Sequence, residues 1–170
     1  MNVESILRTY FSGEKSEAAL ILLAGVICLI GAVWLWVWIR QPFARGLAAT
    51  LLLVAALGLV VGGSVYSRTD KQLQQLIQLH RTDPGRFAAQ EAPRIRQVVT
   101  SFSLYRLGYA VAVLLALAFV FAVGKPSFHG LAVGLLLLAA LGFTIDYFAE
   151  ARAIEYVQAL EAAGAVPRLR

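Results

Sequence analysis

The stretch AALILLAGVICLIGAVWLWVWI, residues 18–39, runs for 22 residues without a charged side chain. At a rise of about 1.5 Å per residue, an α-helix of this length crosses about 30 Å of hydrocarbon. Residues 47–66, 107–123 and 131–148 form three similar runs, and Asp146 is the only charged residue within them. The sequence therefore predicts four transmembrane helices, at residues 18–39, 47–66, 107–123 and 131–148.

The composition supports a lipid environment for this 170-residue chain. Hydrophobic residues make up 59% of it, charged residues 15%, and the mean hydropathy is +0.72. These values are too apolar for an ordinary soluble domain. Because unpaired backbone amides cost several kcal/mol each in lipid, the spans should be helices rather than strands. We expect an all-α integral membrane protein, residues 1–170 as one membrane domain, with its four spans arranged as two antiparallel hairpins.

The distribution of charge predicts how the chain is oriented. With four spans, the N-terminus, residues 67–106 and the C-terminus share one side, which holds twelve of the fifteen basic residues. The opposite side holds Arg40, Arg45 and Lys125. By the positive-inside rule, both termini are cytoplasmic. Arginine outnumbers lysine, and alanine and leucine abound, which favours a GC-rich bacterial genome. We therefore expect a multi-pass protein of the bacterial inner (plasma) membrane.

Three segments lie outside the predicted spans. In residues 1–13, apolar side chains recur at helical spacing, which predicts a short interfacial helix that Ser12 and Gly13 end. Residues 149–170 are expected to form a cytoplasmic helix and tail. Residues 67–106 are polar, with a turn signal at Asp83-Pro84-Gly85 and a stripe at helical spacing on each side of it. The stripe positions are Leu73, Leu76, His80, Phe87, Glu91, Ile95, Val98, Phe102 and Tyr105. This pattern predicts a cytoplasmic helical hairpin, packed on its own inner face, that extends spans two and three.

The predicted hairpins bring opposite charges together at the cytoplasmic boundary. Folding about Pro126 places Arg106 opposite Asp146, and folding about Pro42 brings Arg68 level with Glu17. The whole candidate cluster comprises Asp146, Glu150, Arg106, Arg96, Glu155, Tyr105 and Tyr147, with Arg96 near Glu155 and Tyr105 opposite Tyr147.

This cluster has two interpretations. In the first, its ion pairs fix helix register, and an arginine recovers much of the desolvation cost of a carboxylate near hydrocarbon. In the second, Asp146 and Glu150 share a helix face that lines a polar pocket for an anionic lipid headgroup, a cation or a charged segment of a partner. The first is favoured because it is sufficient by itself.

Other recognisable chemistry is missing from the sequence. No nucleophile set, metal-ligand spacing or nucleotide-binding motif occurs, so we expect no catalytic residues, no metal and no cofactor. The basic excess lies along a membrane boundary, so nucleic-acid binding is not expected. Two GxxxG motifs, Gly58/Gly62 and Gly130/Gly134, allow close helix packing. Packing within the chain is favoured over a dimer interface, and a homo-oligomer remains an alternative.

Three functions fit this layout. The favoured one is a non-enzymatic protein-binding module of the accessory, assembly or immunity type, which acts through residues 67–106 and 149–170. The alternatives are an oligomeric ion channel or carrier, and a small membrane enzyme that acts on a lipid or amphipathic substrate at the cytoplasmic interface. The insertion between spans two and three and the polar extension of span four are similar in outline to the flagellar stator type of proton channel. That similarity covers topology only.

Overall fold

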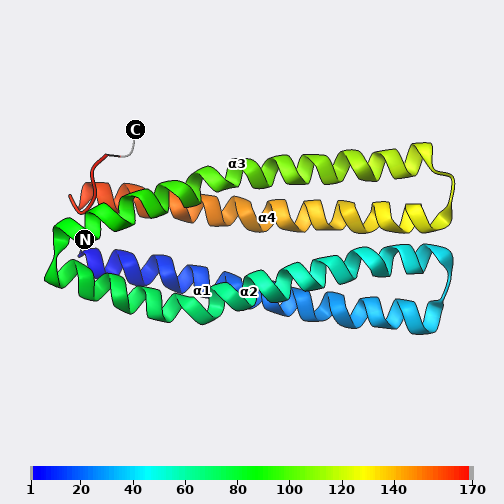
Figure 1. Cartoon of the computed structure of the whole chain (residues 1–170), viewed down its shortest axis with the longest axis horizontal. Helices are drawn as coiled ribbons and strands as arrows, with labels where there is room; N and C mark the ends of the chain where they lie inside the picture. Colours follow the sequence, from blue (N-terminus) through cyan, green and yellow to red (C-terminus); the bar gives the residue numbers. More distant parts are fainter. Residues whose placement is uncertain (1, 169–170) are drawn as a thin grey trace.

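The computed structural model describes residues 2–168, which form four long helices and no strand. A five-residue π-helical turn, η1, follows α1, and Figure 1 shows the helices in chain order. The elements are α1 (Val3–Trp34), η1 (Leu35–Ile39), α2 (Pro42–Thr82), α3 (Pro84–Ala122) and α4 (Pro126–Ala162). The predicted all-helical fold with four long apolar helices is confirmed, since each helix is long and apolar enough to cross a membrane.

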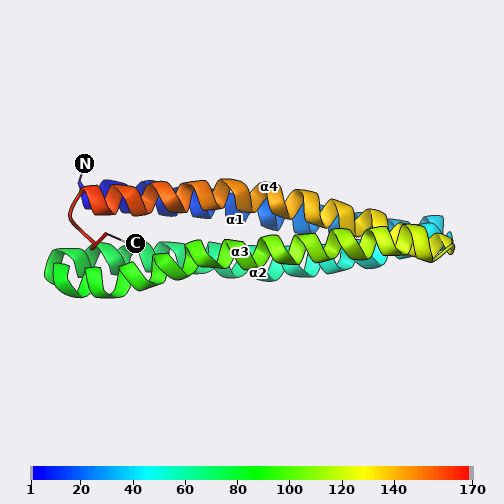
Figure 2. The same ribbon diagram turned by 90° about the horizontal axis from the view of Figure 1, so that it is seen from above.

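The helices form an elongated bundle with both chain ends at the same end of it (Figure 1). Helix α1 lies antiparallel beside α2, and α3 lies antiparallel beside α4. Figure 2 shows α1 and α4 in one layer and α2 and α3 in the other. The 41 residues of α2 extend for about 60 Å, roughly twice the thickness of bilayer hydrocarbon. We call the end that holds the termini the polar end and the opposite one the far end.

Helix α1 is continuous through Ser12 and Gly13, which differs from the expected break between a surface helix and the first span. Gly13 has a packing role instead. A Cβ atom at this position would lie 2.7 Å from Cδ of Arg152 on α4, so the missing side chain lets that arginine pass. The first residues of α1 are thereby held against α4 and belong to the bundle.

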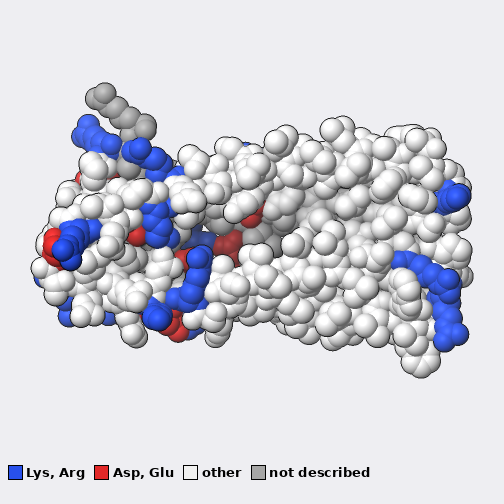
Figure 3. Space-filling view, viewed as in Figure 1, with Lys and Arg blue, Asp and Glu red and all other residues white. Residues whose placement is uncertain are grey.

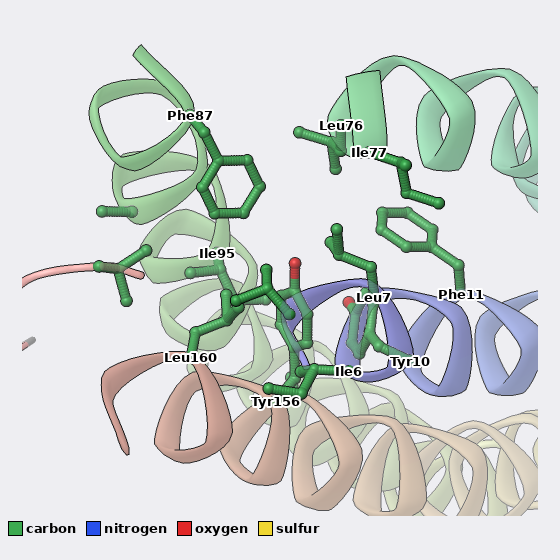
Figure 4. Close-up of a cluster of buried hydrophobic side chains, with 14 of the residues drawn as sticks. Ile6, Leu7, Tyr10, Phe11, Leu76, Ile77, Phe87, Ile95, Tyr156 and Leu160 are labelled. Atoms are coloured by element: carbon green, nitrogen blue, oxygen red, sulfur yellow. The ribbon is translucent and has the colours of Figure 1, made fainter. Parts of the chain in front are cut away.

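The polar end has a hydrophobic core to which all four helices contribute (Figure 4). Its largest fully buried apolar side chains are Leu7, Phe11, Phe87, Ile95 and Leu160. The apolar stripes of residues 67–106 were expected to pack only on each other, but they also pack on α1 and α4. The reason is that α1 and α4 extend to the same level and have apolar faces of their own to bury. The separate helical hairpin is therefore half of a four-helix bundle.

At the far end, α2 and α4 are in backbone contact. A Cβ atom added to Gly46 would overlap the carbonyl oxygen of Ser127 and lie 2.8 Å from its carbonyl carbon. One added to Gly130 would overlap the carbonyl oxygen of Phe43 and lie 2.8 Å from the backbone nitrogen of Leu47. Such distances are impossible for a real side chain, so only glycine permits this approach. We call this contact the glycine seam.

The GxxxG motifs are used within the chain, as the sequence favoured. Gly58 lies against α1, where an added Cβ would be 3.1 Å from the carbonyl oxygen of Ile21. Gly134 accommodates Thr50, whose hydroxyl donates a 3.3 Å hydrogen bond to the carbonyl oxygen of Leu131. Small residues thus allow both the α1–α2 and the α2–α4 contacts, as is common where apolar helices pack without a driving force from water.

The glycine seam predicts a sharp difference between two glycine substitutions. Gly46→Ala should lower the free energy of unfolding by about 1–3 kcal/mol, the usual cost of overpacking, because the new methyl group meets backbone that cannot move aside. Gly108→Ala is the matched control, since no atom lies within 4 Å of its added Cβ. Alanine there should be neutral or stabilising by up to about 1 kcal/mol. Denaturation in detergent, followed by tryptophan fluorescence, measures both, and equal stability of the two variants would contradict the seam.

Candidate functional site

Charged side chains are segregated along the bundle. Figure 3 shows acidic and basic atoms together over the polar half, whereas the far end shows basic atoms alone. This distribution agrees with the sequence. All ten acidic residues lie in the polar half, and Asp146 is among those nearest the apolar half. Two groups of ionic contacts result, one at the boundary with the apolar half and one inside the polar end.

At the boundary, Asp146 and Glu150 of α4 both face α3 but have different partners. The hydroxyl of Tyr109 donates a 2.6 Å hydrogen bond to Oδ2 of Asp146. The guanidinium of Arg106 forms an ion pair with Glu150. The sequence placed Arg106 opposite Asp146, one helical turn away from the observed partner. Helical side chains incline toward their own N-terminus, so in antiparallel helices Arg106 and Glu150 lean toward each other.

Gly142 positions the tyrosine of this pair. A Cβ atom there would lie 2.6 Å from a ring carbon of Tyr109 and 2.9 Å from its hydroxyl oxygen. Without a side chain at Gly142, the phenol ring lies close against α4 and reaches Asp146. Tyr109 was not among the predicted site residues, although its place one turn after Arg106 on the same helix face was a usable signal.

A pocket of about 30 Å³ lies beside these contacts, with room for about one or two water molecules. Its lining residues come from α3 and α4, and four of them belong to the predicted cluster. They are Phe102, Arg106, Phe143, Asp146, Tyr147 and Glu150. The sequence therefore identified most of this pocket. Its size suits water or a small ion and not a lipid headgroup.

The remaining members of the predicted cluster lie apart from the pocket. Arg96 and Glu155 are both exposed, and no ion pair joins them in the described part of the chain. Tyr105 is also exposed, and its ring makes an edge contact with Phe102 at a centroid distance of 6.0 Å rather than meeting Tyr147. The structure brings together Arg106, Asp146, Glu150 and Tyr147 only.

The second predicted pair, Glu17 with Arg68, is replaced by two others. Glu17 accepts a hydrogen bond from Arg152 of α4, the side chain that passes Gly13. Arg68 instead lies 3.6 Å from Oε1 of Glu14. The predicted pairing compared only the levels of α1 and α2. The partner of Glu17 comes from α4, so that comparison could not identify it.

Glu14 lies among basic groups but is incompletely satisfied. Its side chain is 16% exposed, and its Oε2 atom is buried with no hydrogen-bond partner within residues 2–168. Burial raises the pKa of the Glu14 carboxyl, and the positive charges of Arg68, Arg94 and Arg152 oppose that effect. The net direction is upward, so the surroundings disfavour the charged form of Glu14.

The most buried charge in the described chain, Glu91, was not proposed as a site residue. Its side chain is fully buried, and it accepts a 2.6 Å hydrogen bond from the hydroxyl of Tyr156. The neighbouring Arg94 donates two hydrogen bonds to it, of 2.7 and 2.5 Å. The sequence contained a signal for this network, because Glu91 occupies a position in the apolar stripe after Pro84. A charge on a core-facing position needs hydrogen-bond partners, and here Arg94 and Tyr156 are those partners.

Aromatic rings enclose this network. Tyr10 stacks on Tyr156 at a centroid distance of 4.2 Å, and the Arg94 guanidinium lies 5.5 Å from the ring centre of Phe11. Burial raises the pKa of Tyr10 to about 12. The pKa of Tyr156 is also raised, by burial and then by the charge of Glu91. Both phenols therefore stay protonated over the physiological range, and the hydroxyl of Tyr156 remains a donor to the carboxylate.

Chemically, these contacts join the helices. Ion pairs link α1 to α2, as in Lys15 with Asp70 at 2.5 Å, α1 to α4 through Arg152, and α3 to α4 through Arg106. Among the described residues, no group of three or more His, Cys, Asp or Glu side chains is placed to hold a metal ion. Comparison with protein-family models, curated proteins and solved structures finds no match to this chain.

The raised pKa of Glu14 gives a pH-dependent prediction. Between its unfolded and folded pKa values the folded protein holds more protons than the unfolded one, so this residue lowers stability as the pH rises through that interval. Above the pKa of Glu14 in the folded protein, this decrease in stability reaches its full size. Glu14→Gln lacks the titrating group and should therefore raise the melting temperature at pH 7, with a smaller gain near pH 4. Thermal unfolding in detergent at both pH values measures this difference.

Glu4→Gln is the matched control with the opposite sign. The hydrogen bonds from Arg81 lower the pKa of Glu4, so this residue stabilises the fold at neutral pH and its contribution is lost on acidification. Glutamine at position 4 should lower the melting temperature at pH 7, and the difference should shrink as the pH falls below about 4. A Glu14→Gln variant that is less stable than the native chain at pH 7 would contradict the assignment.

Proposed function

We propose that this chain is a multi-pass protein of the bacterial inner membrane, with both termini in the cytoplasm, which acts as a non-enzymatic protein-binding module. Exposed apolar side chains along the helices support its membrane insertion. Phe121 is 83% exposed, Leu20 66% and Leu114 65%. In water such a surface would be unfavourable over its whole length, whereas in lipid it is the expected exterior.

The shared core of the polar end is the observation that carries the binding function. Because apolar residues from all four helices meet there, α2 and α3 are held in one arrangement along residues 67–106. Their outward faces carry glutamine and basic side chains. A rigid polar surface of two helices is suited to recognise a folded partner, since little ordering is required on binding.

The charge of this surface indicates the chemistry of the partner. Residues 67–106 contain seven basic and three acidic residues. The acidic residues are already paired, Asp70 with Lys15, Asp83 with Arg86 and Glu91 with Arg94. Lys71 and Arg96 are exposed and form no ion pair within residues 2–168. We infer an acidic partner surface that docks on the cytoplasmic part of α2 and α3.

The proposed orientation can be tested by labelling single cysteines. The native cysteine, Cys28, is first replaced by alanine, and a cysteine is then introduced at Gly85 or at Gln41. Gln41 directly precedes α2, and Gly85 lies in the first turn of α3, just after α2 ends. An impermeant thiol reagent should therefore label Gln41→Cys from outside intact spheroplasts and Gly85→Cys only after lysis. Labelling of both from the same side would overturn the transmembrane arrangement.

The binding function is tested by affinity purification from the membranes of the host cell. We expect a stoichiometric protein partner, and the double variant Lys71→Glu/Arg96→Glu should retain about tenfold less of it, because like charges then face each other. Lys125→Glu, at the far end, is the matched control and should retain the native amount. Absence of any stoichiometric partner, or equal retention by both variants, would contradict this function.

A further inference from the structure

A groove of about 280 Å³ lies between the end of α1 and the start of α2, in the apolar half near the far end. Ala32 forms its fully buried floor. Its walls are exposed and apolar, formed by Val33, Trp36, Val37 and Leu52. No charged side chain lines it, so the groove suits a hydrocarbon chain.

The backbone beside this groove adopts two uncommon conformations. Helix α1 ends in the π-helical turn η1, and Arg40 then has φ 54°, in the left-handed region. Its Nε atom donates a 2.7 Å hydrogen bond to the carbonyl oxygen of Val37. Single π-turns and left-handed residues other than glycine are costly, and both are concentrated at functional sites. Here the hydrogen bond holds the Arg40 side chain beside Val37, which lines the groove, and we call this side of the groove its mouth.

A second arginine stands at the same mouth. Arg45 precedes Leu52 by seven residues on α2. Seven residues are close to two turns of an α-helix, so Arg45 lies on the same side of α2 as Leu52, about 10 Å further toward the far end. Both arginines are exposed.

The charge around this mouth is entirely positive. Figure 3 shows only basic atoms at the far end, and the sequence places no acidic residue there. The first turn of α2 also begins here, without a side-chain cap from Gln41, so its free backbone N–H groups add positive potential. An anionic group is therefore the complementary ligand for the mouth.

We propose that this groove binds one acyl chain of an anionic phospholipid whose phosphate is held by Arg40 and Arg45. The inference rests on the membrane insertion proposed above but not on the protein partner. A free anion would leave the apolar groove empty, and an apolar helix of another protein would leave both guanidinium groups without a counter-charge. A lipid with a negative headgroup satisfies both parts. Arginine also suits phosphate because its planar guanidinium can donate two parallel hydrogen bonds.

The tryptophans of this region provide the test. The chain has three tryptophans, all between positions 34 and 38, and Trp36 lines the groove. In a Trp34→Phe/Trp38→Phe background, Trp36 is the sole tryptophan. The protein is reconstituted in phosphatidylcholine vesicles that contain the same fraction of brominated phosphatidylglycerol or brominated phosphatidylcholine. We expect Trp36 to be quenched preferentially by the anionic lipid, with a relative affinity that each arginine increases by about fivefold.

Variants at the far end separate a specific site from general attraction. Arg40→Gln/Arg45→Gln should remove the preference for brominated phosphatidylglycerol, whereas Lys125→Gln, at the neighbouring turn, should keep it. Both arginines are exposed, and their loss from the far side leaves the cytoplasmic charge excess intact, so insertion should be unaffected. Circular dichroism confirms that the variants are folded.

Three outcomes would overturn the site. Equal quenching by the two lipids would mean that only ordinary boundary lipid contacts Trp36, and the membrane insertion would stand. A preference that survives the double arginine substitution would exclude Arg40 and Arg45 as the phosphate ligands. No quenching by either lipid would place Trp36 outside the bilayer, which would overturn the membrane insertion together with the site.

Discussion

The contact of α2 with α4 at Gly46 and Gly130 is the constraint on which the rest of this structure depends. There the carbonyl oxygens of Ser127 and Phe43 occupy the space that side chains would fill. Close contact between backbones gives such apolar helices packing attraction that does not depend on expelling water. The glycine seam joins one helix pair to the other in the apolar half, while the hydrophobic core joins them at the polar end. Between these two contacts, ionic groups complete the assembly.

Glycine also serves the polar side chains of this bundle. Gly13 makes room for Arg152 to reach Glu17, and Gly142 makes room for Tyr109 to reach Asp146. In both cases a long side chain crosses from one helix to a carboxylate that lies next to the apolar half. A carboxylate in that position is costly without a donor. The small residue on one helix therefore determines whether a charge on the same helix can be satisfied.

The sequence predicted the four helices, the apolar stripes and the packing of the GxxxG motifs within the chain, because these depend on local periodicity and on residue size. The partners in each ion pair were harder to predict from the sequence. Mirroring a hairpin gives the level of each Cα atom but not the inclination of the side chain, so Arg106 was assigned to Asp146 instead of Glu150. Mirroring one hairpin also gives no information on contacts between helices that are not consecutive, such as α1 with α4. Glu91 was visible as a charge within an apolar stripe, yet its partner Tyr156 comes from a distant segment.

The position of the glycine seam near one end of long, uninterrupted helices has a mechanical consequence. Helix α2 is a single rod of about 60 Å, held against α4 at the glycine seam within its first two turns and by the shared hydrophobic core near its other end. A rod that is held at both ends can move only together with its neighbours, so a displacement of the tip where α2 meets α3 is resisted at the seam. The fold therefore links its two ends mechanically through continuous helices, without any change of secondary structure.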